Sequence, residues 1–226
     1  MSVDLRIALQ EERASETADR VRRLLGPFSG SELALDSGCG TGAFAFALAP
    51  HVGEVVGADT RTEYLEAARE RAPENARFVE GDSMALPFDY GSFDIAGCLR
   101  LLHHVHRPEL AVSELVRVTR PGGRILIMDQ LGSVDPLRSL EQDRFERLRD
   151  PSHERLLPDA DIRGFLDAND LVLVTSEIVR ERVDLEQRLE LAGVPEDERV
   201  RVRGLAPDAL YDVEVGWYVA RKSGPS

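Results

Sequence analysis

Lysine is almost absent from this sequence of 226 residues: of its 28 basic residues, only Lys222 is a lysine and the others are arginines. We attribute the excess of arginine to a coding bias of the source genome. Schiff-base chemistry needs a lysine amine that its surroundings activate. Because the single lysine lies in the tail of the chain, the sequence disfavours enzymes of that class.

Cysteine is also scarce, and the histidines lack the spacing of a metal site. Cys39 and Cys98 are the two cysteines, too few for a disulfide framework. Three of the five histidines, His103, His104 and His106, lie within four residues, but no set of Cys, His and Asp has the spacing of zinc ligands. The sequence therefore predicts no metal.

Net positive charge and long apolar runs are both missing. The formal net charge is −13, which disfavours nucleic acid as a partner because phosphate contacts need a basic surface. No apolar run approaches the ~20 residues of a spanning helix, and the charged segment 1–23 lacks the apolar stretch of a secretion signal. We expect a cytoplasmic protein that binds neither membrane nor nucleic acid; composition leaves the oligomeric state open.

Apolar patterning predicts strands and helices that alternate along the first 130 residues. Strands are expected at 31–36, 55–59, 77–80, 93–99, 124–128, 171–179 and 211–220. Helices are expected at 3–25, 41–49, 62–71, 109–119, 136–149, 158–168 and 184–208, the last with a break at 193–195. Such alternation indicates βαβ units, and strands with little polar alternation indicate a parallel sheet that is covered on both faces.

A turn rich in glycine joins the first predicted strand to the helix after it. Gly38, Gly40 and Gly42 lie in this turn, where glycine allows a positive φ or close approach to a ligand. The following helix start offers free N–H groups and the positive end of a dipole. The turn predicts a nucleotide site, and with Ala43 it also fits the loose dinucleotide pattern. A tight turn without a ligand remains an alternative.

Asp59 ends the second predicted strand, 21 residues after Gly38. A carboxylate at this place accepts hydrogen bonds from the ribose hydroxyls of an adenosine ligand. Each hydrogen bond to a charged acceptor contributes roughly 1.5–3 kcal/mol. The alternative is that Asp59 only caps the N-terminus of the next helix.

Four separate segments together resemble one known family. They read LDSGCGTG at 35–42, GAD at 57–59, EGDSMALPF at 80–88 with GSFD at 91–94, and LHHV at 102–105 leading to RVTRPGG at 117–123. This set, in this order, is similar to class I S-adenosylmethionine-dependent methyltransferases, of the bacterial subgroup of ubiquinone and menaquinone methyltransferases. The resemblance covers roughly residues 31–130 and weakens beyond them.

The resemblance implies S-adenosyl-L-methionine as the cofactor, with S-adenosyl-L-homocysteine as its product. The implied cofactor site consists of Asp36, Ser37, Gly38, Cys39, Gly40, Asp59, Thr60, Asp82, Ser83, Met84, Cys98, Leu99 and Arg100. In it, Gly38 and Gly40 shape the pocket for the methionine end, and Asp59 holds the ribose. Asp82 accepts from the adenine amino group, and the backbone at Leu99 contacts the methionine amino group. The acidic members lie at predicted strand ends, where open α/β sheets bind ligands.

The resemblance also implies the architecture. It is an α/β fold with a Rossmann-like, mostly parallel seven-stranded sheet, helices on both faces, an antiparallel last strand and a helical cap. Without repeats or linkers, residues 1–226 are expected to form a single domain. Its parts are an N-terminal helix or lid (1–30), a cofactor-binding core (31–130), and the cap with the C-terminal strands (131–226).

The expected activity is methyl transfer to a small-molecule acceptor by in-line displacement. Orientation of the reactants contributes roughly 7–11 kcal/mol to such reactions, and a base is needed only if the acceptor must lose a proton. His103 and His153 are the predicted catalytic residues, with His104 as a further candidate, and a plain packing role is the alternative for each. Segments 131–157 and 181–208 are expected to close over the acceptor.

Two alternatives to this activity stay open. One is an NAD-type oxidoreductase of Rossmann fold, and the other is a non-catalytic protein that binds S-adenosylmethionine. The sequence does not distinguish methylation of oxygen, nitrogen or carbon.

Overall fold

A seven-stranded sheet forms the centre of the computed structural model, which describes residues 3–191, 193–205 and 208–224. Its strands are β1 (Leu33–Ser37), β2 (Glu54–Asp59), β3 (Ala76–Glu80), β4 (Phe93–Leu99), β5 (Thr119–Gln130), β6 (Leu171–Asp184) and β7 (Leu210–Lys222). Their order is β3-β2-β1-β4-β5-β7-β6, in which β1 to β5 are parallel and β7 is antiparallel to both of its neighbours. The predicted mostly parallel sheet with an antiparallel last strand is confirmed.

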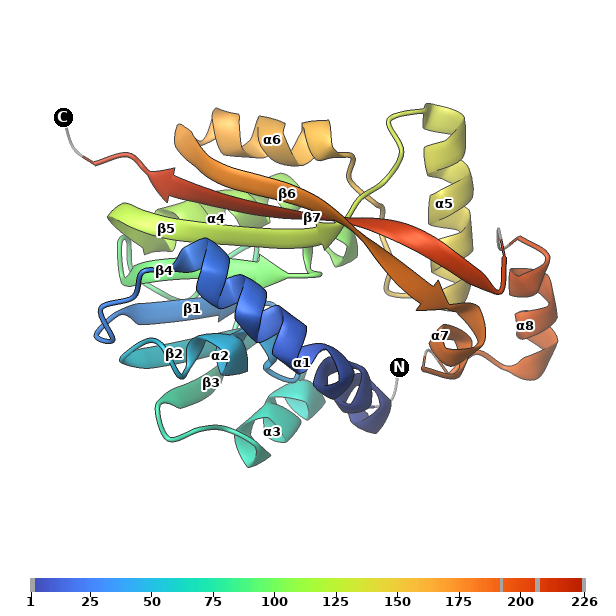
Figure 1. Cartoon of the computed structure of the whole chain (residues 1–226), viewed down its shortest axis with the longest axis horizontal. Coiled ribbons are helices and arrows are strands. Elements are labelled where there is room, and N and C mark those ends of the chain that lie inside the picture. Colours follow the sequence, from blue (N-terminus) through green and yellow to red (C-terminus); the bar gives the residue numbers. More distant parts are fainter. Residues whose placement is uncertain (1–2, 192, 206–207, 225–226) are drawn as a thin grey trace.

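Helices cover both faces of the sheet (Figure 1). On one face lie α1 (Val3–Leu25), α2 (Ala43–Leu48) and α3 (Thr62–Glu70), and on the other lie α4 (Pro108–Val118) and α6 (Asp159–Ala168). Successive strand residues point to opposite faces, so Ala34 and Val55 join one apolar core while Leu35 and Val56 join the other. Strands that are apolar on both faces therefore need both layers of helices.

The remaining helices gather near the end of the sheet where the parallel strands finish (Figure 1). They are the short 3-10 helix η1 (Leu102–His104), α5 (Pro136–Arg149), α7 (Leu185–Leu191) and α8 (Glu196–Arg203). The start of α5 is well defined, because Asp135 accepts hydrogen bonds from the N–H groups of Leu137 and Arg138 and Pro136 begins the helix. Over the residues described, no helix combines the length and the apolar character that crossing a membrane requires.

Several element boundaries differ from the predicted ones. β6 runs to Asp184 rather than 179, because it pairs with β7 along its whole length, up to Asp184 opposite Leu210. The predicted cap segment 181–208 therefore begins as a strand. β5 begins at Thr119 rather than 124, with an irregular register opposite β4. The break predicted at 193–195 within the helical segment 184–208 is confirmed, since it separates α7 from α8; residues 192 and 206–207 lie outside the described residues.

Candidate functional site

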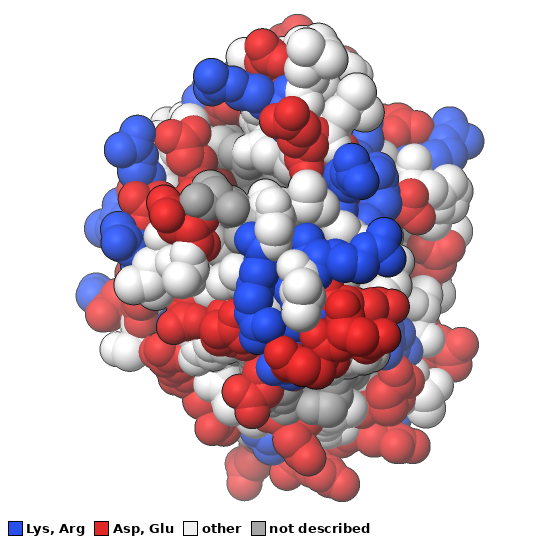
Figure 2. Space-filling model, turned by 90° about the vertical axis from the view of Figure 1, so that its right-hand side faces the viewer, with Lys and Arg blue, Asp and Glu red and all other residues white. Residues whose placement is uncertain are grey.

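A cavity of about 380 Å³ opens at the carboxyl ends of β1, β4 and β5. α1 covers it, α2 lies at its base, and the end of β6 with the start of α7 forms the far wall. Its lining is rich in arginine: Arg6, Arg13, Arg71, Arg100, Arg182 and Arg188. Figure 2 views this end of the molecule and shows a band of basic side chains beside a cluster of acidic ones. The position is the one where open α/β sheets bind ligands.

The glycine turn between β1 and α2 borders this cavity. Gly38, Gly40 and Gly42 have φ values of +66°, +52° and +95°, the left-handed region that favours glycine. The N–H groups of Gly38 and Cys39 both donate to the carbonyl of Ala58, at 2.8 and 3.0 Å, and so bind the turn to β2. A Cβ atom at Gly38 would come within 2.4 Å of a methyl carbon of Leu101. Both the backbone conformation and the available space therefore require glycine at this position.

Two acidic side chains, those of Asp36 and Asp59, accept main-chain hydrogen bonds that hold the glycine turn and α2 in place. Asp36, on β1, is buried and accepts a hydrogen bond from the Ala45 N–H of α2 at 2.9 Å. Burial raises the pKa of Asp36 to about 8; the Ala45 hydrogen bond opposes this rise and the nearby Asp59 adds to it. Asp59 accepts from the N–H of Gly40 at 2.8 Å and from that of Arg61 at 2.9 Å. The alternative role of Asp59 as a helix cap is wrong, since Arg61 occupies the N-cap of α3 and no side chain caps that helix.

Polar atoms without partners surround the turn. Among the described residues, the hydroxyls of Ser37 and Tyr64 and the Nε of Arg6 are buried and have no hydrogen-bond partner. Arg6 Nε lies 3.3 Å from where a Cβ of Gly40 would stand, and the guanidinium is 5.0 Å from the centroid of the Tyr64 ring. A buried polar group that makes no hydrogen bond costs about 1–3 kcal/mol. The turn therefore offers a glycine cradle and unpaired polar atoms to a polar ligand.

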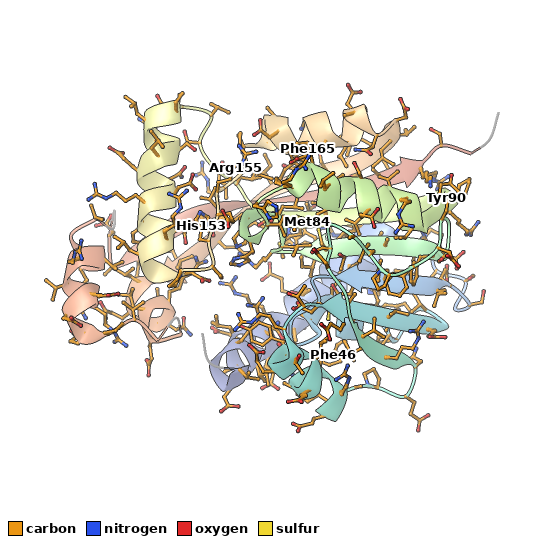
Figure 3. All side chains as sticks on the ribbon, turned by 180° about the vertical axis from the view of Figure 1, so that it is seen from behind. Phe46, Met84, Tyr90, His153, Arg155 and Phe165 are labelled. Carbon is orange, nitrogen blue, oxygen red and sulfur yellow. The ribbon has the colours of Figure 1, made fainter. Side chains whose placement is uncertain are left out.

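The structure brings six of the fifteen predicted site residues to the cavity. Those that line it are Asp36, Gly38, Cys39, Leu99, Arg100 and His103. The other nine are outside the lining: Ser37, Gly40, Asp59, Thr60, Asp82, Ser83, Met84, Cys98 and His153. Met84 packs against the core on the α4 face, away from Phe46 of the cavity wall (Figure 3). Asp82 is exposed and accepts from the N–H of Met84 at 2.8 Å.

The two cysteines are buried and unreactive in this environment. Both are free thiols. Burial raises the pKa of Cys39 and that of Cys98 well above the ordinary value, and neighbouring carboxylates add to the effect. A thiol that stays protonated is a poor nucleophile, which agrees with a packing role for both.

His103 lies in η1 and binds a buried carboxylate. The ring Nδ1 of His103 is hydrogen-bonded to Oδ1 of Asp129, and the main-chain N–H of His103 donates to Oδ2 of Asp129 at 3.2 Å. Asp129 also accepts from the N–H of Gln130 at 2.7 Å. Burial favours a higher pKa for Asp129, but His103 and the Gln130 hydrogen bond outweigh it and lower the pKa. Asp129 is therefore ionised at neutral pH.

The structure places His104 and His153 beside His103. The ring centroid of His103 lies 4.1 Å from that of His104 and 5.7 Å from that of His153. Burial lowers the pKa of His104 to about 3, and its Nδ1 lies 3.1 Å from the carbonyl of Ser152. Burial also lowers the pKa of His153, whose Nε2 lies 2.9 Å from Asp143 of α5 (Figure 3). Both neighbours are therefore neutral at neutral pH.

Sequence reasoning missed two acidic residues of the site. Asp129 directly follows the predicted strand 124–128, so the strand-end reasoning applied to Asp59 also indicates it. Glu181, on β6, had no such signal: it forms ion pairs with Arg13 of α1 and with Arg100 after β4. Burial favours a higher pKa for Glu181, but Arg100 and Arg13 outweigh it and lower the pKa. This ion-pair bridge joins α1, β4 and β6 around the cavity.

Of the predicted cap, the second segment contributes much more than the first. Segment 181–208 places Arg182, Val183, Asp184, Gln187 and Arg188 on the cavity, whereas segment 131–157 places Asp150 there. α1 contributes more of the lining than either segment.

Comparisons with known proteins match this chain to methyltransferases. The family model described as a methyltransferase domain matches residues 35–127. The uncharacterized methyltransferase YcgJ of Bacillus subtilis is 33% identical over 172 residues, which cover 74% of this chain and 68% of YcgJ. The crystal structure of YcgJ matches with a TM-score of 0.86 and 25% identity, covering 93% of this chain and all of that one.

Two further matches are more distant. The demethylmenaquinone methyltransferase of Clavibacter sepedonicus is 35% identical over 137 residues, covering 60% of this chain. The chain spans a little over half the length of that relative, 56%. A phosphoethanolamine N-methyltransferase of Haemonchus contortus, solved with S-adenosyl-L-methionine, shares the fold, with a TM-score of 0.66 and 19% identity over 92% of this chain and 52% of that one.

Proposed function

The chain belongs to the class I S-adenosylmethionine-dependent methyltransferases, and from this premise we propose that it binds S-adenosyl-L-methionine at the glycine turn and methylates a small molecule in the adjoining cavity. The main support is the position of that cavity, which opens from the turn at the carboxyl ends of the parallel strands. When bound, this cofactor supplies a methyl group on a sulfonium that departs as a neutral thioether.

We assign the cofactor contacts as the family resemblance implies. The methionine end lies at Asp36, Ser37, Gly38, Cys39 and Gly40, the ribose at Asp59 and Thr60, and the adenine at Asp82, Ser83 and Met84. The methionine amino group lies at the backbone of Cys98 and Leu99, with Arg100 beside them at the mouth of the site. Each carboxylate oxygen of Asp59 already accepts one main-chain hydrogen bond, and each has a second lone pair with which to accept a ribose hydroxyl. The unpartnered hydroxyl of Ser37 and the glycine cradle fit the same ligand.

The chain's own contribution is to orient the acceptor and keep out water. α1 acts as the lid in this proposal, because it covers the cavity and is joined to the opposite wall through Arg13 and Glu181. The end of β6 and α7 complete the enclosure. Where the acceptor must lose a proton, His103 and His153 are the candidate bases, and His103 is the one that lines the cavity.

Calorimetric titration with S-adenosyl-L-homocysteine tests the cofactor assignment. We expect micromolar binding that weakens at least tenfold, about 1.4 kcal/mol, in Asp59→Ala, with no heat from NAD. Asp89→Ala is the matched control, since Asp89 is exposed in the loop after β3 and should leave affinity unchanged. Binding of NAD in place of S-adenosyl-L-homocysteine would point to the alternative of an NAD-type oxidoreductase. Equal affinity in Asp59→Ala would remove the ribose assignment.

A further inference from the structure

His103 differs from the other histidines in two properties taken together. It lines the cavity, and its ring is held by a buried carboxylate. His104 lines the cavity but is hydrogen-bonded to a carbonyl and a hydroxyl of Ser152. His153 is held by Asp143 but lies outside the lining. A histidine that lines a cavity and has one ring nitrogen hydrogen-bonded to a carboxylate has the arrangement of a general base.

Asp129 determines which nitrogen of His103 is available. An ionised carboxylate only accepts hydrogen bonds, so Nδ1 of His103 carries a proton, and in the neutral form of the ring Nε2 has a free lone pair. Two main-chain N–H groups, those of His103 and Gln130, hold the carboxylate in place. Asp129 is 1% exposed, so water does not screen the pair. Asp129 is therefore a positioning residue that orients the ring and stabilises its cation.

Several titratable and charged groups face His103 or border its cavity. Asp129 faces it from β5, His104 from its own turn and His153 from the loop after α5. Burial lowers the pKa of both neighbouring rings, His104 and His153. Asp150 and Arg100 border the same cavity, and Glu181 is the partner of Arg100. Of these groups, Asp129 is the one that is hydrogen-bonded to the His103 ring.

We propose, on the basis of the proposed function, that His103 and Asp129 form a proton-abstracting pair and that the methyl acceptor is a weakly acidic hydroxyl compound of phenol or enol type. Such a hydroxyl keeps its proton at neutral pH, as the tyrosine side chain does with a pKa of about 10. Thiols ionise more readily and need less help from a base. Leu99 and Met128, beside the pair, give apolar walls for a ring.

Methyl transfer to the hydroxyl oxygen needs only the acceptor, the cofactor and the His103–Asp129 pair. The hydroxyl proton passes to Nε2 of His103 while an oxygen lone pair forms the bond to the methyl carbon. The bond from carbon to sulfur breaks, and its electron pair stays on sulfur. The imidazolium, stabilised by Asp129, then returns its proton to solvent.

Three probes with one ring, phenol, thiophenol and aniline, test this assignment at pH 7 with radiolabelled S-adenosylmethionine. The wild-type chain should methylate phenol. Asp129→Asn, which keeps the shape of the side chain, should lower kcat for phenol about 100-fold or more with KM within threefold, as removal of a general base does. Thiophenol turnover should change less than about threefold. His103→Gln should behave in the same way, and the exposed-site control Asp89→Asn should match the wild type.

A second readout does not depend on turnover. 4-Nitrophenol changes its absorbance when it loses its proton, so binding can be followed in protein saturated with S-adenosylhomocysteine. At a pH below the ligand's own pKa, the wild-type chain should bind it as the coloured phenolate, and both variants should bind it mainly as the neutral phenol. Calorimetry with S-adenosylhomocysteine checks that each variant is folded. If Asp129→Asn does not fold, His103→Gln is used to test the pair in its place.

The outcomes separate this inference from the proposed function. Equal losses with phenol and thiophenol would mean that Asp129 is structural and would overturn the pair. If S-adenosylhomocysteine binds but no hydroxyl probe binds or reacts, the acceptor class is wrong while the methyltransferase assignment stands. Methylation of aniline in place of phenol would likewise mean that the acceptor class is wrong while the methyltransferase assignment stands. Absence of S-adenosylhomocysteine binding would overturn both.

Discussion

Replacing Gly38 with alanine tests the idea that the glycine turn is required by both backbone and space. At a φ of +66°, a residue with a Cβ costs about 1–2 kcal/mol. The new Cβ would lie 2.4 Å from a methyl carbon of Leu101 and 3.0 Å from its Cγ. Leu101 is buried, so relieving this contact requires repacking at a cost of about 1–3 kcal/mol. Together these effects predict a loss of about 2–5 kcal/mol in the free energy of unfolding.

Urea unfolding of Gly38→Ala, compared with that of Gly122→Ala, separates the cost of the backbone conformation from the cost of the clash with Leu101. Gly122 has a φ of +76°, and its added Cβ would meet nothing within 4 Å. Gly122→Ala should therefore lose about 1–2 kcal/mol, from the backbone alone. In a Leu101→Ala background the extra loss of Gly38→Ala should shrink, because the clashing side chain is gone. Equal losses for the two glycine variants, or no coupling to Leu101, would refute the packing argument.

Two further perturbations test the charges of the site. Because burial raises the pKa of Asp36 from 3.8 to about 8, the folded chain keeps a proton that the unfolded chain releases between these pH values. This group should therefore make the free energy of unfolding fall as pH rises from about 4 to about 8, by at most about 1.4 kcal/mol per pH unit. Asp36→Asn should remove that part of the slope in urea titrations across this range; an unchanged slope would contradict it. Glu181→Gln removes the carboxylate between Arg13 and Arg100, whose ion pairs are partly exposed and contribute about 1 kcal/mol each at most. Amide exchange in α1 should then become faster with little change in global stability, whereas unchanged exchange would show that the bridge does not hold the lid.

The position of the site residues at the ends of predicted strands is enough to locate much of the site. Asp36, Asp59 and Leu99 all lie at or next to the ends of parallel strands, and parallel strands bring their carboxyl ends to one edge of the sheet. The positive φ values of the turn follow from local sequence as well, since three glycines stand where a strand meets a helix. These features depend on neighbouring residues and on a general rule of topology, so the amino-acid sequence by itself determined them.

Contacts between distant segments were decided only by the tertiary structure. Glu181 meets Arg13 across 168 positions of the chain and Arg100 across 81, because α1 crosses the sheet end where β6 extends beyond its predicted limit. That extension comes from pairing with β7, whose register no local pattern specifies. Likewise, His103 meets Asp129 because η1 folds back onto the end of β5. Burial between these elements then sets the charge of each group, and burial is a property of the packed chain rather than of any one segment.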